Sequence, residues 1–255
     1  MAKQNKLSPR FLKKSQHLLD VSHLLAAGPN KYKSRFGRIL EGVFRKDYFT
    51  LQTIVVLADK VEKDDQFRIV FGGSILDLSR RVFEDMIYME CINESGKKEV
   101  YSKQFFDYVA VDRKADLDFL LNSGVQVDQK IVKIVKDDYK KTPQRLKDRK
   151  NWAGQSVDQV IAWLVESGKI EESRKADVLK IYLAGNRKNH TSPSDILGHL
   201  YQETLDFDSE QDIEMGLMIT HGSLIKVGLL LVAETEASDE IKKALRACWE
   251  SINKG

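Results

Sequence analysis

Apolar residues recur at three- and four-residue intervals along almost the whole chain, and this spacing constrains the fold more than any other feature. It gives each predicted helix one apolar face. No segment alternates apolar and polar residues long enough to predict a strand, the nearest being 66–71 and 124–127. Only four prolines occur and 31% of residues are charged, a composition that favours long helices. We therefore predict an all-α fold, a single multi-helix bundle of about nine to eleven helices.

Helix boundaries follow from start and stop signals. Ser8 and Pro9 mark one start, Ser156 with Gln159 forms a capping box, and Thr142-Pro143 breaks a longer segment. The paired Gly72-Gly73 predict a bend or a close helix crossing. The predicted helices span residues 9–27, 34–63, 64–93, 96–122, 127–147 with its break, 156–168, 171–185, 211–236 and 238–252.

A chain of 255 residues can bury a sizeable core. We expect residues 1–62 to form an N-terminal helical extension and 63–255 a helical core domain, unless the two are continuous. Cys91 and Cys248 lie in apolar helical patterns and are predicted to be buried free thiols. No run reaches 18 apolar residues and the first residues lack the apolar run of a signal peptide. We therefore expect a cytoplasmic protein with no membrane partner.

Charge is distributed unevenly. Residues 1–50 carry eleven Lys and Arg against three acids, residues 130–150 carry nine against three, and residues 203–240 carry ten acids against one Lys. Such segments indicate either a nucleic-acid face, here RNA, or basic and acidic patches that pair within the fold or across a homodimer. The apolar run within 211–236 is too continuous for a surface helix, so it is either central core or a dimer seam.

Polar side chains with chemical potential crowd the segment 182–195. Ser192 starts a helix, and a capped helix junction explains that part. Arg187, Asn189 and His190 lie just upstream. If the preceding helix continues to His190, Arg187 and His190 are one turn apart, and the pair could hold a phosphate while His190 moves a proton. The alternatives are a metal-independent ribonuclease site and an ordinary helix junction.

Charged residues around Glu84, two tryptophans and a set of histidines each have a structural interpretation beside a functional one. Glu84 can pair with either Arg80 or Arg81, or these charges reach a pocket beside His190. Trp152 and Trp163 are interpreted as core anchors. The set Asp195, His199 and His221 lacks the usual spacing of metal-binding motifs, so core or surface histidines are the favoured interpretation, and no metal or cofactor is expected.

The order of several motifs resembles an uncharacterised bacterial family of helical proteins. The motifs, within residues 65–205, are Arg81-Val-Phe-Glu84 with Tyr88, Phe105-Phe106-Asp-Tyr108, Trp152, Tyr182 and His190-Thr-Ser-Pro. The resemblance implies a bacterial, all-helical cytosolic protein in which Arg81, Glu84, Tyr182 and His190 deserve testing, and it implies no established activity. A weaker similarity to the HEPN ribonuclease and toxin superfamily implies a dimer with Arg and His at its cleft. In that superfamily the Arg and the His are four to six residues apart, whereas Arg187 and His190 have only two residues between them. The resemblance then requires Arg81, from another helix, to supply the cation.

Two function classes follow. As an enzyme, the chain is a stress- or phage-defence effector that cleaves RNA. His190 is then the general acid and base, Arg187 or Arg81 stabilises phosphate charge, and Glu84 or Asn189 orients them. As a non-catalytic module, it docks a protein or nucleic-acid partner. Convergence of Arg81, Glu84, Tyr182 and His190 in an open cleft favours the enzyme, and burial in a closed network favours the module.

Overall fold

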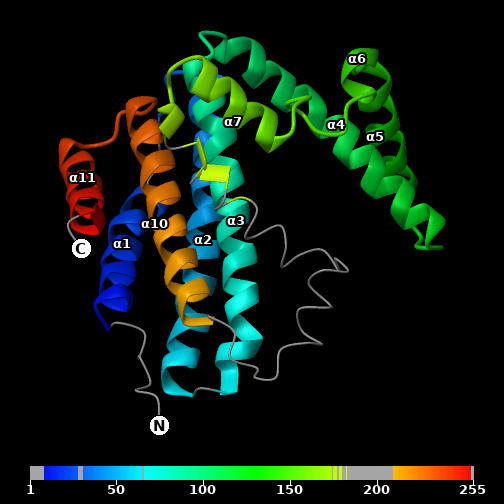
Figure 1. The fold of residues 1–255 in the computed structure, drawn as a ribbon. Helices are drawn as coiled ribbons and strands as arrows, with labels where there is room; N and C mark the ends of the chain where they lie inside the picture. Colours follow the sequence, from blue (N-terminus) through cyan, green and yellow to red (C-terminus); the bar gives the residue numbers. More distant parts are fainter. Residues whose placement is uncertain are drawn as a thin grey trace.

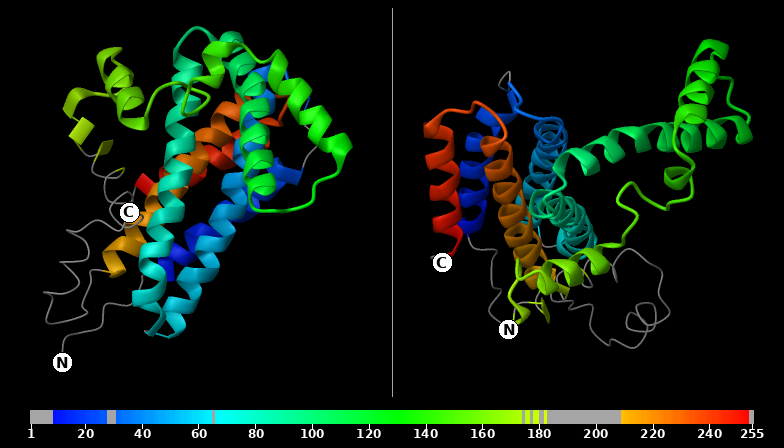
Figure 2. Two further views of the ribbon diagram at one scale, coloured as in Figure 1. Left: turned by 90° about the vertical axis from the view of Figure 1, so that its right-hand side faces the viewer. Right: turned by 90° about the horizontal axis from the view of Figure 1, so that it is seen from above.

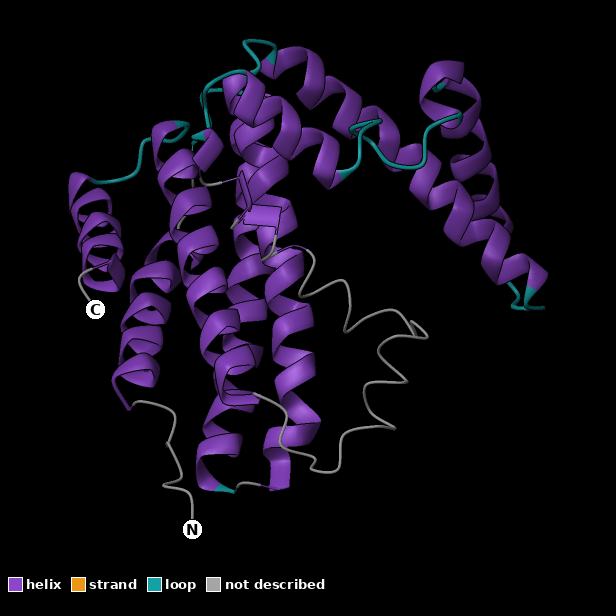
Figure 3. Cartoon of the chain, viewed as in Figure 1, coloured by secondary structure: helices purple, strands orange, loops and turns teal. Residues whose placement is uncertain are grey.

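The protein is all-α, as predicted, in a computed structural model that describes residues 9–27, 31–64, 66–173, 175–176, 178–179, 182 and 209–253. Within these residues nine helices are defined, and short loops join most of them (Figure 3). The helices are α1 (Pro9–Ala27), α2 (Arg35–Lys63), α3 (Gln66–Glu94), α4 (Lys98–Asn122), α5 (Gln129–Lys141), α6 (Gln144–Lys147), α7 (Val157–Glu166), α10 (Ser209–Ala233) and α11 (Asp239–Asn253).

Five helices, α1, α2, α3, α10 and α11, lie side by side and form the frame of the molecule (Figure 1). α10 is central, since it packs against the other four. Its segment Ile213–Ala233 is long and apolar enough to cross a membrane, but 67% of its most apolar window is buried inside the bundle. The apolar run is therefore core, which is one of the two interpretations of the sequence.

Glycines let α10 approach its neighbours closely. A Cβ on Gly228 would lie 2.9 Å from Cε2 of Phe44, and one on Gly216 would lie 2.9 Å from Cγ2 of Ile75. By contrast, α3 runs through Gly72-Gly73 without a break. A Cβ on Gly73 would meet no atom within 4 Å. The close crossing predicted at this pair is thus absent at Gly73, and the crossings are made by α10.

The core continues across the predicted division at residue 62. One buried cluster joins Leu18 of α1 and Phe44 of α2 to Met89 of α3, Leu224 of α10 and Leu245 of α11. The division falls in the last turn of α2, which ends at Lys63, and it stays a prediction. Both cysteines, Cys91 and Cys248, are buried and free, as predicted.

A second cluster attaches α7 to α3, with the buried side chains of Val160, Ile161 and Leu164 packed against Phe83 and Ile87. The capping box of Ser156 and Gln159 is formed at the start of α7. Trp163 is partly buried in this cluster. Trp152 packs against the frame, its ring centroid 5.5 Å from that of Tyr88 and 5.2 Å from that of Phe105. Both tryptophans are core anchors, as predicted.

Helices α4, α5 and α6 form an arm that projects from one end of the frame, green at the right of Figure 1 and again in both views of Figure 2. α5 folds back along the distal half of α4, and the break at Thr142-Pro143 separates α5 from α6, as predicted. We call residues 98–147 the arm and residues 119–134 its tip.

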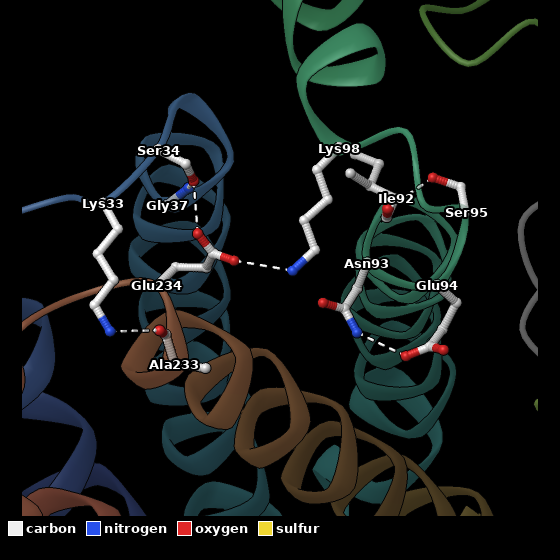
Figure 4. A network of polar contacts seen from close by, with 10 residues as sticks. All are labelled: Lys33, Ser34, Gly37, Ile92, Asn93, Glu94, Ser95, Lys98, Ala233 and Glu234. Carbon is white, nitrogen blue, oxygen red and sulfur yellow. Dashed lines mark hydrogen bonds and ion pairs between the residues drawn. The ribbon is translucent and has the colours of Figure 1, made fainter.

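A polar network holds the root of the arm (Figure 4). Lys98, in the first turn of α4, forms an ion pair with Glu234 at 2.9 Å (Nζ to Oε1), and the hydroxyl of Ser34 donates to the other carboxylate oxygen at 2.6 Å. Burial raises the pKa of Glu234, but the hydrogen bonds from Ser34 and Lys98 outweigh it, and the net shift is downward. The carboxylate therefore stays ionised and ties α4 to α2 and α10.

Candidate functional site

A band of charged side chains runs along α3. Arg80 bonds Glu84 at 2.8 Å (Nη1 to Oε1) and approaches Asp77 at 3.7 Å, whereas Arg81 bonds Asp77 at 3.1 Å. Of the two ion pairs considered for Glu84, the structure thus contains the one with Arg80. The side chain of Arg81 is 60% exposed, so it presents its cation to solvent.

Glu84 and Tyr182, two of the predicted site residues, both lie near Tyr88. Burial raises the pKa of Tyr88 to about 12, and the charges of Glu84 and then Tyr182 add to the shift. The Tyr88 hydroxyl donates to the carbonyl oxygen of Gln155 at 3.0 Å. Burial also raises the pKa of Glu84, against the lowering effect of Arg80. Carboxyls with a raised pKa occur in many active sites, and also in structural ion-pair networks.

The rest of the predicted cluster lies outside the described residues: Arg187, Asn189 and His190, together with Asp195 and His199. Of the four residues expected to converge in an enzyme, the structure places Glu84 and Tyr182 close to the same residue, Tyr88, whose pKa both of them raise. Arg81 lies on the same helix as Glu84, and His190 is outside the described residues. A cavity of about 310 Å³ lies elsewhere, between α1 and α2, and is lined by Leu12, Gln16, Val55, Val56, Asp59 and Lys60.

Asp47 is a functional candidate that the sequence reasoning missed. It is fully buried on α2, and Asp85 of α3, which forms an ion pair with Lys46, is the charge that acts on it most strongly. Burial, and then Asp85, raise the pKa of Asp47 far above its ordinary value, so the carboxyl is neutral at pH 7. Neither of its oxygens has a well-formed hydrogen bond within the described residues. Its spacing of three residues from Phe44 and four from Leu51 was the available signal.

His221 is a core histidine, as favoured. It is fully buried on α10, and its Nε2 lies 2.8 Å from the hydroxyl of Ser15, which itself donates to the carbonyl oxygen of Phe11. Nε2 therefore carries the proton that Ser15 accepts. Burial lowers the pKa of His221 to about 4, which keeps the ring neutral. In the described ranges no group of three His, Cys, Asp or Glu side chains could hold a metal ion.

The arm tip exposes apolar side chains that sequence reasoning did not single out. Phe119 is 71% exposed and Ile134 is 59% exposed. Among the described residues, six of the fourteen exposed large hydrophobic residues fall in these sixteen positions: Phe119, Leu120, Leu121, Val125, Ile131 and Ile134. Single exposed hydrophobic residues are ordinary, but a concentration of this kind marks an interaction surface.

The basic segment predicted from composition also lies on the arm. Lys130, Lys133 and Lys136 are exposed on α5 and form no ion pair with any residue that the structure describes. Two further lysines, Lys114 and Lys147, form cation–π contacts with Tyr139, at 5.5 and 4.7 Å from the centroid of its ring. Free positive charge is thus concentrated on α5, beside the exposed apolar residues.

Comparison with known proteins yields no relative: no family model, no curated protein and no solved structure matches the chain. The resemblances to a bacterial helical family and to the HEPN superfamily accordingly stay expectations. Functional reasoning has to start from the geometry of the α3 band and of the arm.

Proposed function

We propose that the chain is a non-catalytic docking module in which the frame is a scaffold and the arm binds a partner. The observation that carries the proposal is the concentration of exposed apolar side chains on the arm tip. Burying one large apolar side chain is worth about 1.5–3 kcal/mol. A tip that leaves six of them in water forgoes that stabilisation, which is understandable if a partner covers them.

The packing of the arm supports the same conclusion. α5 has a strongly amphipathic pattern, yet its only buried residue is Val132. The hairpin is fixed at its root instead: Lys98 is paired with Glu234, the Tyr108 hydroxyl donates to the carbonyl oxygen of Arg149 at 3.1 Å, and Arg149 donates to Gln104 at 3.2 Å. A firmly anchored root and an uncovered tip are suited to presenting a binding surface.

A photocrosslinking experiment in cells tests this function. A photoreactive amino acid replaces Ile134 at the tip and, as a matched control, Lys243, an exposed residue of α11. We expect covalent adducts with a partner from position 134 and background from position 243. Equal yields from both positions would contradict the docking role of the arm.

The RNA-cleaving effector is a second candidate, favoured by one specific observation. Glu84 has a raised pKa and shares the neighbour Tyr88 with Tyr182, and in sequence Tyr182 is five to eight residues before Arg187, Asn189 and His190. In this proposal His190 is the general acid and base, Arg187 or Arg81 stabilises phosphate charge, and Glu84 or Asn189 orients them.

Purified chain incubated with RNA tests the second candidate. For an enzyme, His190→Ala should reduce cleavage by about two to four orders of magnitude with little change in melting temperature. Arg187→Ala should also reduce it, whereas Ser167→Ala, at the end of α7, should not. An inert parent protein would refute the enzyme and leave the docking module.

A further inference from the structure

We infer that the arm tip docks on an anionic lipid surface and inserts its apolar side chains at the boundary between headgroups and acyl chains. The inference rests on the docking role proposed for the arm and names the partner. It departs from the expectation of no membrane partner. That expectation rested on the absence of a spanning apolar run, and a hairpin that binds at the surface needs no such run.

The exposed apolar residues all lie at the distal end of the hairpin. Lys114 of α4 lies over the ring of Tyr139 of α5, 5.5 Å from its centroid, so position 114 is level with position 139. Counting toward the tip from that pair, Ile134 is level with Phe119, and Ile131 is level with position 122. With a rise of 1.5 Å per residue, Phe119 lies ~4.5 Å from the end of α4 at Asn122. Val125 lies in the loop beyond that end.

These residues point in more than one direction. On α4, Leu117 is buried and Phe119 is two residues further on, about 200° around the helix. On α5, Val132 is buried, while Ile131 and Ile134 are turned about 100° and 200° away from it. A flat protein surface would cover one side of the hairpin. A lipid surface surrounds the inserted end, so it covers all of them.

The charge of the tip suits anionic headgroups. Two acids of this end are bonded within the arm: Asp118 by Lys114 at 2.6 Å, and Asp128, the N-cap of α5, by the backbone N–H of Lys130 at 2.7 Å. Asp116, one turn before Leu120, is exposed and lies farther from the end of the hairpin than both lysines. Lys130 and Lys133 have no ion-pair partner among the described residues. Each lysine near an anionic membrane strengthens binding by about fivefold at moderate salt.

The length of the apolar end matches the depth of a lipid interface. Amphipathic helices that bind at the membrane surface bury their apolar residues about 5–10 Å deep. The helical part of the tip from Phe119 onward is ~4.5 Å long, and the loop that carries Val125 extends beyond it. α5 also has the composition of such helices, with five lysines among its thirteen residues and low average hydrophobicity. Depth, charge and the several directions of the side chains agree on one partner.

Flotation of the full chain with lipid vesicles tests the inference. Vesicles of phosphatidylcholine containing phosphatidylglycerol should bind the protein, and vesicles of phosphatidylcholine alone should bind it much more weakly. Lys130→Gln combined with Lys133→Gln should weaken binding by about 25-fold at low salt. The matched control, Lys13→Gln with Lys243→Gln, removes the same charge from exposed lysines of α1 and α11 that form no ion pair with a described residue. It should bind like the parent.

A tryptophan reporter tests which part of the chain enters the lipid. Val125→Trp places the reporter in the loop of the tip, and Glu99→Trp places it on the exposed root of α4. Lipids brominated on the acyl chains should quench the additional fluorescence at position 125 and leave that at position 99 unchanged. Phe119→Ser with Ile134→Ser should abolish binding while the circular dichroism spectrum is preserved.

Several outcomes overturn the inference. Binding that is equal on neutral and anionic vesicles, or that survives both tip variants, would show that the tip is not the lipid-binding element. No vesicle binding, together with a concentration-dependent dimer that Phe119→Ser with Ile134→Ser abolishes, would identify a second copy of the chain as the partner. That result would leave the docking role standing, whereas background crosslinking from position 134 would remove the docking role as well.

Discussion

Gly228→Ala should destabilise the protein, although alanine is the better helix former. A Cβ at this position would lie 2.9 Å from Cε2 of Phe44 and 3.2 Å from Cδ1 of Leu245, and both of these side chains are fully buried. Forcing a methyl group into a packed core costs about 1–3 kcal/mol. The gain in helix propensity is about 1 kcal/mol, so the free energy of unfolding should fall by up to ~2 kcal/mol.

Gly222→Ala is the matched control, since it lies in the same helix and its Cβ would meet its nearest atom, in Trp249, at 3.9 Å. This variant should gain up to ~1 kcal/mol from helix propensity. Urea unfolding followed by circular dichroism measures both changes, and in a domain of this size each kcal/mol corresponds to about 2–4 °C in melting temperature. Equal shifts of the two variants in the same direction would refute the assignment of Gly228 to a close crossing of α10 and α2.

Three further predictions concern the carboxylates and a cap. Asp47→Asn should raise stability at neutral pH, because the raised pKa of Asp47 makes the parent lose stability as pH rises above the ordinary range of a carboxyl. The gain should vanish in acid, where Asp47 is protonated in the folded and the unfolded state. Urea midpoints at several pH values measure it. Glu234→Gln should lower stability at neutral pH. Because the pKa of Glu234 is lowered on folding, the parent should lose its advantage over the variant as pH falls through that depressed pKa. Thermal melts from neutral to acidic pH measure the difference, and a difference that persists in acid would contradict the prediction. Ser156→Ala should cost about 1 kcal/mol by removing the capping box with Gln159, with Ser173→Ala as a control outside the cap, and identical urea midpoints would argue against the cap.

Local chemistry explains why the helix boundaries could be predicted closely. Ser34 caps α2 by accepting the backbone N–H of Gly37 at 3.1 Å, and Pro143 ends α5 near the expected place. These signals act within a few residues of each other, so the sequence contains all their partners. The close crossing predicted at Gly72-Gly73 is absent at Gly73, because which glycine meets a neighbouring helix depends on how α10 packs, and this is set by distant residues.

The charged band was predictable only in part for the same reason. The spacing of Arg80 and Glu84 allowed their ion pair to be predicted as one of two possibilities, since side chains four residues apart on a helix are neighbours. A pair with Arg81 was the alternative. In the structure Arg81 bonds Asp77, four residues before it, and the choice between these partners also depends on which side of α3 is covered. Asp47 was missed since a carboxyl on an apolar face is recognised as neutral only when its neighbour Asp85, on another helix, is known.

The exposure of the apolar residues at the arm tip could not be predicted from their periodicity. The pattern of α5 assigns Ile131, Val132 and Ile134 to one broad apolar face, and within a bundle that face would be covered. In the structure only Val132 of the helix is buried, because among the described helices α4 is the main neighbour of α5 and covers one side of it. Periodicity indicates which residues would benefit from burial, and topology decides how many neighbours are present to bury them. A partner that supplies the missing cover completes what the sequence pattern of α5 encodes, which is why the tip, rather than the satisfied ion pairs of α3, is the surface from which binding is proposed.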